Sequence, residues 1–266
     1  MKSFRAAIGF LTILPVAPRD GDGLAHARAW FPLVGLGLGA LLAGLDLLLN
    51  GWLFLPQGAF VGLTPNYLLE SALLVGLLAA LTRGLHLDGF MDSCDALFGG
   101  HTQARRLEIM RDPHVGAFAV IGVVCLLLIK CVAVASLVQT LRLPVLLLFP
   151  CLSRWAMLLV MELYPYARRA GLGTALLRSG GRHQLLFGFI CALSASLLIA
   201  GVMGLLLLLA ASLVAWLSGA WAARQLGGLT GDVYGAVNEI VETAVLTLAC
   251  FLPVGFLSMP QFFLVP

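Results

Sequence analysis

The chain has 266 residues, of which 61% are hydrophobic and only 11% charged, and its formal net charge is +3. Soluble domains are about 25% charged and disordered chains are poor in apolar residues, so this composition excludes both a typical soluble enzyme and a disordered protein. The small net charge is spread thinly along the chain, which argues against a nucleic-acid partner.

In chain order, the first predicted element is a short helix near Lys2 and Arg5, lying in the membrane interface rather than forming a cleavable signal. Seven apolar segments of roughly 20 residues, the length that crosses a bilayer, follow it. They are Phe31–Leu55, Tyr67–Leu85, Val115–Val138, Pro144–Leu163, Leu185–Ala200, Leu205–Ala223 and Ile240–Leu257. Only Gly201 and Gly204 divide the fifth from the sixth, so six spans are the alternative. The predicted fold is an all-α, polytopic transmembrane bundle forming one domain over residues 1–266.

The basic residues predict the orientation of this bundle. With a cytoplasmic N-terminus and seven spans, most of the sixteen lysines and arginines lie in cytoplasmic segments. Arg142 lies in an outside loop, and Lys130 and Arg154 lie within spans. Merging the fifth and sixth spans would move Arg224 outside, so seven spans fit better. Two segments containing acidic residues, near 83–116 and 225–242, are then cytoplasmic.

The first of these segments carries Asp88, Asp92 and Asp95. If the segment is helical, these three carboxylates share one narrow face, where like charges repel unless a cation lies among them. Oxygen ligands of this kind suit Mg²⁺, which usually takes one or two carboxylates together with substrate phosphates. The alternative is a solvated acidic loop, which the neighbouring Phe90 and Phe98 disfavour.

The second segment reads Gly-Gly-Leu-Thr-Gly-Asp-Val-Tyr-Gly-Ala-Val-Asn-Glu over residues 227–239. Glycines before Asp232 allow backbone N–H groups to approach an anion closely. Asp232 and Glu239 are seven residues apart and share a helical face. Close helix packing explains Gly231 and Gly235 equally well. Since each segment is incomplete alone, we expect both to form one site, with spans two, three and seven as neighbours.

Other polar residues have more limited interpretations. His86 and Asp92 are the candidate general bases, whereas metal ligation by His86 is disfavoured because imidazole is an unusual ligand of Mg²⁺. Arg154 should face the bundle interior, with Glu162 or a substrate phosphate as its partner.

Several motif-like patterns have simpler explanations. The alternating glycines from Gly35 to Gly39 open an apolar run and predict helix packing rather than a dinucleotide site. Glu108, between Arg105 and Arg111, predicts a surface salt-bridge cluster. The six cysteines lack Cys-x-x-Cys spacing and predict neither a zinc site nor a disulfide framework.

Together these motifs resemble the cobalamin synthase family, also called adenosylcobinamide-GDP ribazoletransferases. The resemblance is carried by His-x-Asp-Gly-x-x-Asp-x-x-Asp from His86, the following Gly99-Gly100, the run Arg-Arg-Leu-Glu-Ile-Met-Arg-Asp and Gly116. The stretches 8–15, 30–35 and 227–239 also match, so the resemblance covers nearly the whole chain. The family often has glycine where this chain has Arg83 and Ala96, but no carboxylate is lost.

The resemblance implies a bacterial inner-membrane enzyme that uses Mg²⁺. It joins adenosylcobinamide-GDP to α-ribazole, or to its 5′-phosphate, and releases GMP at the cytoplasmic face. We expect Asp88, Asp92 and Asp95 to hold the metal. Substrate contacts are expected from Gly99, Gly100, Arg154, Gly228, Thr230, Gly231, Asp232 and Glu239. The partners are then the two substrates and the lipid bilayer, with other enzymes of the late cobalamin pathway or a second copy of the chain left open.

Two other functions compete with this one. A transferase joining a nucleotide-activated alcohol to a lipid alcohol would carry a similar Asp-Gly-x-x-Asp pattern, but the second acidic segment weighs against it. A transporter should carry its polar residues near the bilayer midplane on broken helices. Because the acids of this chain cluster at predicted span ends, the transporter is disfavoured.

Overall fold

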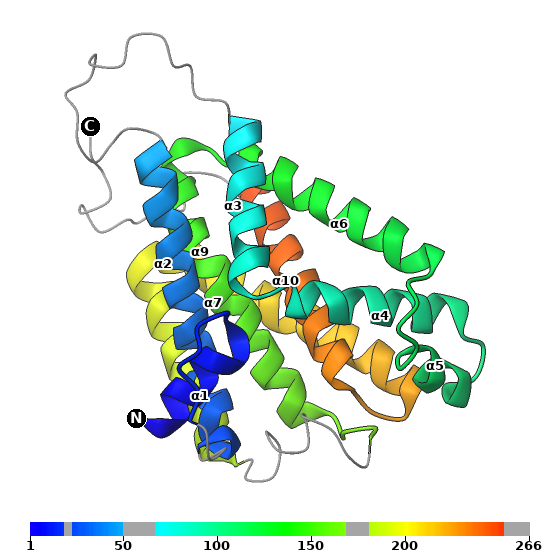
Figure 1. Cartoon of the computed structure of the whole chain (residues 1–266). Helices are drawn as coiled ribbons and strands as arrows, with labels where there is room; N and C mark the ends of the chain where they lie inside the picture. The colour runs from blue at the N-terminus through cyan, green and yellow to red at the C-terminus, as the bar shows by residue number, and fades with distance from the viewer. Residues whose placement is uncertain (19–22, 50–66, 169–180, 253–266) are drawn as a thin grey trace, which may run out of the picture.

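The computed structural model describes residues 1–18, 23–49, 67–168 and 181–252 (Figure 1). Within those ranges every regular element is helical, apart from one isolated bridge between Tyr166 and Leu229. The helices are α1 (Lys2–Leu11), the 3-10 helix η1 (Leu24–Trp30), α2 (Phe31–Leu49), α3 (Tyr67–Leu81), α4 (Leu85–Gly99), α5 (Gln103–Ile109), α6 (Ala117–Ser136), α7 (Gln139–Leu163), α9 (Arg182–Leu226) and α10 (Gly231–Phe251). The all-α prediction is confirmed.

Helix α7 lies at the centre of the bundle, in contact with α2, α9 and α10. Small residues bring α2 against it. A Cβ atom at Gly35 would collide with the carbonyl oxygen of Pro150, and one at Gly39 with that of Leu147, whereas Gly37 faces open space. The predicted role of these glycines in helix packing is confirmed for Gly35 and Gly39.

Five of the described helical segments are long and apolar enough to cross a membrane, or six if the bent pair α3–α4 is one span. This is the construction of a multi-pass membrane protein. Helix α9 has 45 residues, and Gly201 interrupts it with non-helical angles (φ 54°, ψ −130°). On either side of Gly201 the helix is roughly 30 Å long or longer, at 1.5 Å per residue. The predicted boundary between spans five and six falls at this bend, and the total of seven spans stays a prediction.

The predicted second span, Tyr67–Leu85, is too long. Helix α3 ends at Leu81, and the chain turns through left-handed angles at Arg83 (φ 55°) and Gly84 (φ 66°). Helix α4 then leaves at 91° to α3 and runs across the bundle near α10 (Figure 1). Arg83 occupies a conformation that favours glycine, and its Nη2 donates to the carbonyl oxygen of Gly9, 3.2 Å away.

Two further helices begin earlier than the predicted spans that they contain. Helix α7 begins at Gln139 rather than Pro144, and α10 begins at Gly231 rather than Ile240. The added part of α7 contains Arg142, which was expected in an outside loop but is buried and paired with Asp46 at 2.7 Å. The added part of α10 contains Glu239, which is buried and paired with Lys130. Sequence hydropathy counts such residues as polar, although their charges are paired inside the bundle. The predicted ends 50–55 and 253–257 lie outside the described residues. Helix α1 forms as predicted, while its position in a membrane interface and the cytoplasmic N-terminus stay predictions.

Candidate active site

The first acidic segment is helical, as the spacing of its carboxylates requires. Helix α4 places Asp88, Asp92 and Asp95 on one face, with Asp88 exposed and the other two partly buried. Within the described part of the chain, neither the Asp88 nor the Asp92 carboxylate accepts a hydrogen bond. These two acids therefore keep their oxygen atoms available for a ligand.

Asp95 differs from the other two acids because both of its oxygens are engaged. Its Oδ2 accepts from the N–H of Gly116 at 2.6 Å, and its Oδ1 accepts from the N–H of Ala119 at 2.8 Å. A Cβ atom at Gly116 would lie 2.6 Å from Oδ1, so glycine there makes room for the carboxylate. Asp95 thus caps the N-terminus of α6, where free N–H groups and the helix dipole favour a negative charge.

The two acidic segments meet where α4 crosses α10. A Cβ atom at Gly89 would lie 2.6 Å from the carbonyl oxygen of Asp232, and one at Gly235 would lie 3.1 Å from that of His86. One glycine from each segment therefore lets the two backbones touch. Helices α4, α6 and α10 are mutual neighbours. The predicted meeting of the two segments is confirmed.

The loop before α10 is shaped by Gly228, whose φ of 150° is unfavourable for other residues. A Cβ atom there would lie 2.6 Å from the carbonyl oxygen of Pro165. Because glycine has no Cβ atom, the two segments can approach each other. The N–H of Leu229 donates to the carbonyl oxygen of Pro165 at 2.8 Å, and the N–H of Ala167 donates to the carbonyl oxygen of Leu229 at 2.8 Å. Thr230 then caps α10 by accepting from the N–H of Val233 at 3.3 Å.

This loop brings Arg168 to the site, a residue that sequence reasoning missed. Its Nη2 forms an ion pair with Oδ2 of Asp232 at 2.7 Å. In the sequence, Arg168 is marked only as a basic residue of a predicted cytoplasmic segment, which bears on topology and not on a site. No spacing in the sequence links residue 168 to residue 232; the pairing of residues 165–167 with Leu229 does.

The carboxylates around Asp92 set its ionisation. Partial burial, and then the charges of Asp88 and Asp232, raise the pKa of Asp92 to about 6, while Arg168 opposes the rise. Each nearby carboxylate makes a second negative charge harder to hold. The site therefore has excess negative charge that a cation would relieve.

His86, the other candidate base, lies on the opposite, buried side of α4. Its Nδ1 is 3.4 Å from Nη2 of Arg154, and its Nε2 is buried without a partner among the described residues. Burial, followed by the charge of Arg154, lowers the pKa of His86 to about 3. The imidazole is therefore neutral near pH 7 and faces the bundle rather than the acids.

Arg154 and Glu239 lie deeper, in a network that we call the buried ion-pair network: Lys130, Arg154, Glu239 and Glu242. Lys130 Nζ is 2.5 Å from Glu239 and 2.6 Å from Glu242, and Arg154 pairs with Glu242. Arg154 faces the interior as predicted, but its predicted partner Glu162 was wrong, since Glu162 pairs with Arg28 at 3.0 Å. The argument against a transporter assumed that the acidic residues cluster at the ends of spans. Glu239 and Glu242, which are buried within α10, contradict that assumption.

The remaining predicted glycines lie at the ends of helices. Gly99 is the exposed last residue of α4, and Gly100 is its C-cap, where a Cβ atom would lie 2.5 Å from Cγ of Arg106. Gly231 is the exposed first residue of α10, with open space around it. Contact of these glycines with substrate stays a prediction.

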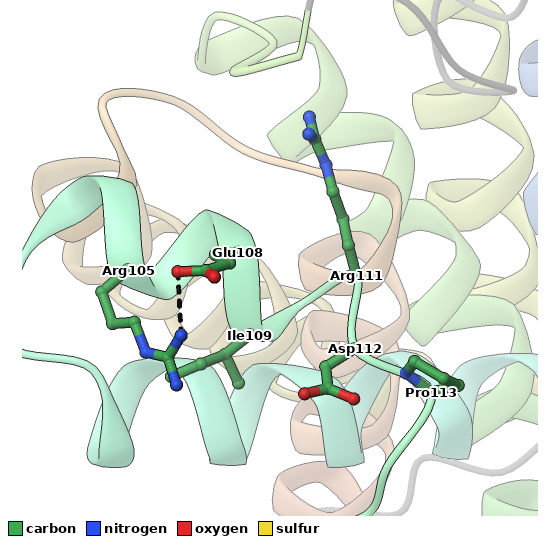
Figure 2. A pocket seen from close by; sticks show the side chains of 6 residues that line it. All are labelled: Arg105, Glu108, Ile109, Arg111, Asp112 and Pro113. Carbon is green, nitrogen blue, oxygen red and sulfur yellow. Dashed lines mark ion pairs between the residues drawn. The ribbon is translucent and has the colours of Figure 1, made fainter.

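A cavity of about 270 Å³ lies beside α5, lined by Arg105, Glu108, Ile109, Arg111, Asp112 and Pro113. Figure 2 shows Arg105 paired with Glu108, and Arg111 pointing away from both. The Arg105–Glu108 distance is 2.8 Å, with both side chains more than half exposed, as predicted for a surface salt bridge. Because both of its acids are already paired, Glu108 with Arg105 and Asp112 with His114, this cavity is a weaker candidate for a binding site than the carboxylates of α4.

The carboxylates fit Mg²⁺ only in part. Among the described residues, no three His, Cys, Asp or Glu side chains are grouped closely enough to hold a metal by themselves. Mg²⁺ usually takes one or two protein carboxylates and completes its shell with water and substrate phosphates. Asp88 and Asp92, with free oxygens beside Asp232, match that requirement better than a closed metal cage would.

The family profile and the curated relatives described below belong to the same enzyme family. The profile of the cobalamin-5-phosphate synthase family matches residues 3–250. A protein of Desulforamulus reducens named adenosylcobinamide-GDP ribazoletransferase is 37% identical over 92% of this chain and 95% of its own length. Proteins with the same name from Stutzerimonas stutzeri (41% identical, over 90% of this chain and 94% of theirs) and Chlorobium phaeobacteroides (35% identical, over 95% and 98%) are also similar. No solved structure matches the chain.

Proposed function

Because the chain belongs to the cobalamin-5-phosphate synthase family, we propose that the carboxylates at the crossing of α4 and α10 are the active site of its ribazoletransferase reaction. The enzyme is an adenosylcobinamide-GDP ribazoletransferase of cobalamin biosynthesis. One observation supports this location above all others. Gly89 and Asp232 are in backbone contact, which joins the only two acidic motifs of the resemblance.

The reaction exchanges one phosphorus–oxygen bond for another. A ribose hydroxyl of α-ribazole, or of its 5′-phosphate, attacks the phosphorus attached to cobinamide. The bond from that phosphorus to the bridging oxygen breaks, GMP leaves with the electron pair, and the hydroxyl proton must be accepted. Of the two candidate bases, Asp92 lies on the carboxylate face, whereas His86 is buried on the other side of α4. We assign proton acceptance to Asp92.

The protein's own residues supply positioning and charge, which dominate catalysis of phosphoryl transfer. Asp88 and one oxygen of Asp92 would hold Mg²⁺, which when bound offsets the charge of the diphosphate, and the other Asp92 oxygen would stay available to accept the proton. Asp95 ties α4 to α6 through two hydrogen bonds, and Thr230 caps the start of α10. These contacts hold Asp92 and Asp232 in a fixed relation before substrate arrives.

The test is release of GMP by the purified full-length protein. We expect GMP to form from adenosylcobinamide-GDP only when α-ribazole and Mg²⁺ are both present, in equal amount to the cobalamin product. Activity should disappear with a chelator and return with added Mg²⁺. Release of GMP with a lipid alcohol in place of α-ribazole would favour the competing transferase. Unchanged activity in the chelator would reject the role of Mg²⁺ but would leave the proposed reaction standing.

We further propose that the site faces the cytoplasm from a bacterial inner membrane. Cys94, between Asp92 and Asp95, is buried and therefore a poor reporter for labelling. Ala104 on α5 and Thr140 at the start of α7 are both exposed. A membrane-impermeant thiol reagent should label Ala104→Cys only in inverted vesicles and Thr140→Cys in intact cells without an outer membrane. The reverse pattern would overturn this orientation.

A further inference from the structure

Arg168 occupies a position that the known motifs do not account for. It follows the segment 165–167, whose backbone is hydrogen-bonded to Leu229 in the loop before α10. The position of the arginine is thereby fixed to the same loop that delivers Asp232. An ion pair that served only to join the segment to the loop would duplicate hydrogen bonds that already do so.

The guanidinium has donors to spare. Both of its hydrogen bonds within the described residues use Nη2, to Oδ2 of Asp232 at 2.7 Å and to the carbonyl oxygen of Met110 at 3.4 Å. Its Nε is buried and has no acceptor among the described residues. The side chain is 18% exposed, so solvent and ligand can reach the group from one side. Unsatisfied donors on a partly buried cation are costly unless an acceptor arrives.

The surrounding charge identifies that acceptor as an anion. Asp92 experiences the negative charges of Asp88, Asp232 and Asp95, and Arg168 is the cation acting on it. A substrate diphosphate would be repelled by this face unless positive charge met it there. A metal bound by the carboxylates gives one source of positive charge. The planar fork of an arginine, which matches two phosphate oxygens, gives another.

We propose that Arg168 binds the diphosphate of adenosylcobinamide-GDP. The phosphate oxygens accept hydrogen bonds from N–H groups of the guanidinium that do not donate to Asp232. In the free protein, Asp232 holds the guanidinium beside the carboxylate face. On binding, Nη1, which has no acceptor among the described residues, donates to phosphate oxygens. This inference rests on the proposed function, because it names the residue that recognises that reaction's donor substrate.

The experiment measures substrate affinity without turnover. The purified full-length protein is titrated with adenosylcobinamide-GDP and Mg²⁺ in the absence of α-ribazole. Loss of one charge-assisted hydrogen bond costs about 1.5–3 kcal/mol, so Arg168→Gln should raise the Kd by about 10-fold to 100-fold. Arg168→Lys keeps the charge but not the fork and should fall between. Arg105→Gln removes an exposed arginine of a surface salt bridge and should leave the Kd unchanged.

Two further readouts separate recognition from structure. The KM for α-ribazole should stay within about 2-fold of wild type in Arg168→Gln, and its Tm should fall no more than that of Arg105→Gln, since exposed or partly exposed ion pairs contribute little stability. An unchanged Kd in Arg168→Gln would overturn the proposal and leave the ion pair a structural one. Wild-type protein that binds the substrate but releases no GMP would count against the reaction, while the ratio of the two Kd values would still report on Arg168.

Discussion

Helix α10 carries two groups of charges that are treated in opposite ways. At its start, Asp232 lies beside Asp88 and Asp92, and among the described residues these three carboxylates face a single arginine, Arg168. Two turns further along, Glu239 and Glu242 are buried and neutralised by Lys130 and Arg154. Deep in a membrane bundle an unpaired charge is costly, so charges survive there only in pairs. At the partly exposed start of α10 water screens the repulsion, so excess negative charge can persist there.

The largest effect should come from breaking the buried ion-pair network. Lys130→Met leaves Glu239 and Glu242 with one cation between them, Arg154, which contacts only Glu242. Removing one partner of a buried pair costs about 3–5 kcal/mol. We expect a large fall in Tm in detergent, with loss of activity following from loss of the fold.

A double variant separates charge from packing in that experiment. In Lys130→Met/Glu239→Gln one charge of each sign is gone, so the remaining Arg154 and Glu242 balance. The double variant should be more stable than Lys130→Met alone. If the losses in stability from the two substitutions simply add, the charges of the network are not coupled, and its contrast with the acids at the start of α10 fails.

Removing a partly buried acid of the carboxylate face should have the opposite signature. Asp92→Asn should lower turnover by about 100-fold or more, the scale of losing one preorganised electrostatic group. Its Tm should equal or slightly exceed that of wild type, because the substitution removes repulsion among Asp88, Asp92 and Asp232. Glu108→Gln, which neutralises an exposed acid on α5, is the matched control and should leave turnover unchanged. Near-normal turnover in Asp92→Asn would reject the proposed active site.

The contact that joins the two helices can be tested by one methyl group. Gly89→Ala would place Cβ 2.6 Å from the carbonyl oxygen of Asp232. Overpacking of this kind costs about 1–3 kcal/mol, and the shift of α4 against α10 should lower turnover by about 10-fold through lost positioning. Gly76→Ala in α3, where a Cβ atom meets nothing within 4 Å, is the control and should be neutral or stabilising. Equal effects of both substitutions would argue against a specific contact at Gly89.

The sequence predicted the carboxylate face of α4 because helical spacing is a local property. It also predicted the meeting of the two acidic segments, since neither was complete alone. It could not place the start of α10, because Asp232, Glu239 and Glu242 lower the local hydropathy and their cationic partners lie on other helices. Pairing between helices is decided by tertiary structure and leaves no spacing in the chain.

The absence of a sequence signal for pairing between helices also explains why the partners of two arginines were not predicted. Glu162 was the nearest acid to Arg154 on the same predicted span, yet Glu242 of α10 is its partner. Arg168 was counted only as a cytoplasmic charge until the backbone pairing of residues 165–167 placed it beside Asp232. Arg154 was recognised as unusual from its place within a span, whereas Arg168 was not, and the partner of each is defined only by the three-dimensional structure.

Asp95 belongs partly to the carboxylate face and partly to the contacts between helices, and its substitution has the smallest predicted effect on turnover and stability. It shares a face with Asp88 and Asp92, yet its oxygens already accept from Gly116 and Ala119 at the start of α6. Asp95→Asn keeps one acceptor oxygen but turns an N–H group toward the helix end, so it should cost about 1 kcal/mol, typical of a lost cap.

As a cap, Asp95 should matter more for Tm than for chemistry, with turnover kept within about 10-fold of wild type. Thr102→Ala, which removes the cap of α5, is the control for a cap remote from the carboxylates. A metal ligand would behave in the other way: Asp95→Asn would then lose turnover as Asp92→Asn does, with Tm unchanged. The ratio of the two losses, measured on the same protein, therefore assigns Asp95 either to the carboxylates that hold the ligand or to the contacts that hold the helices.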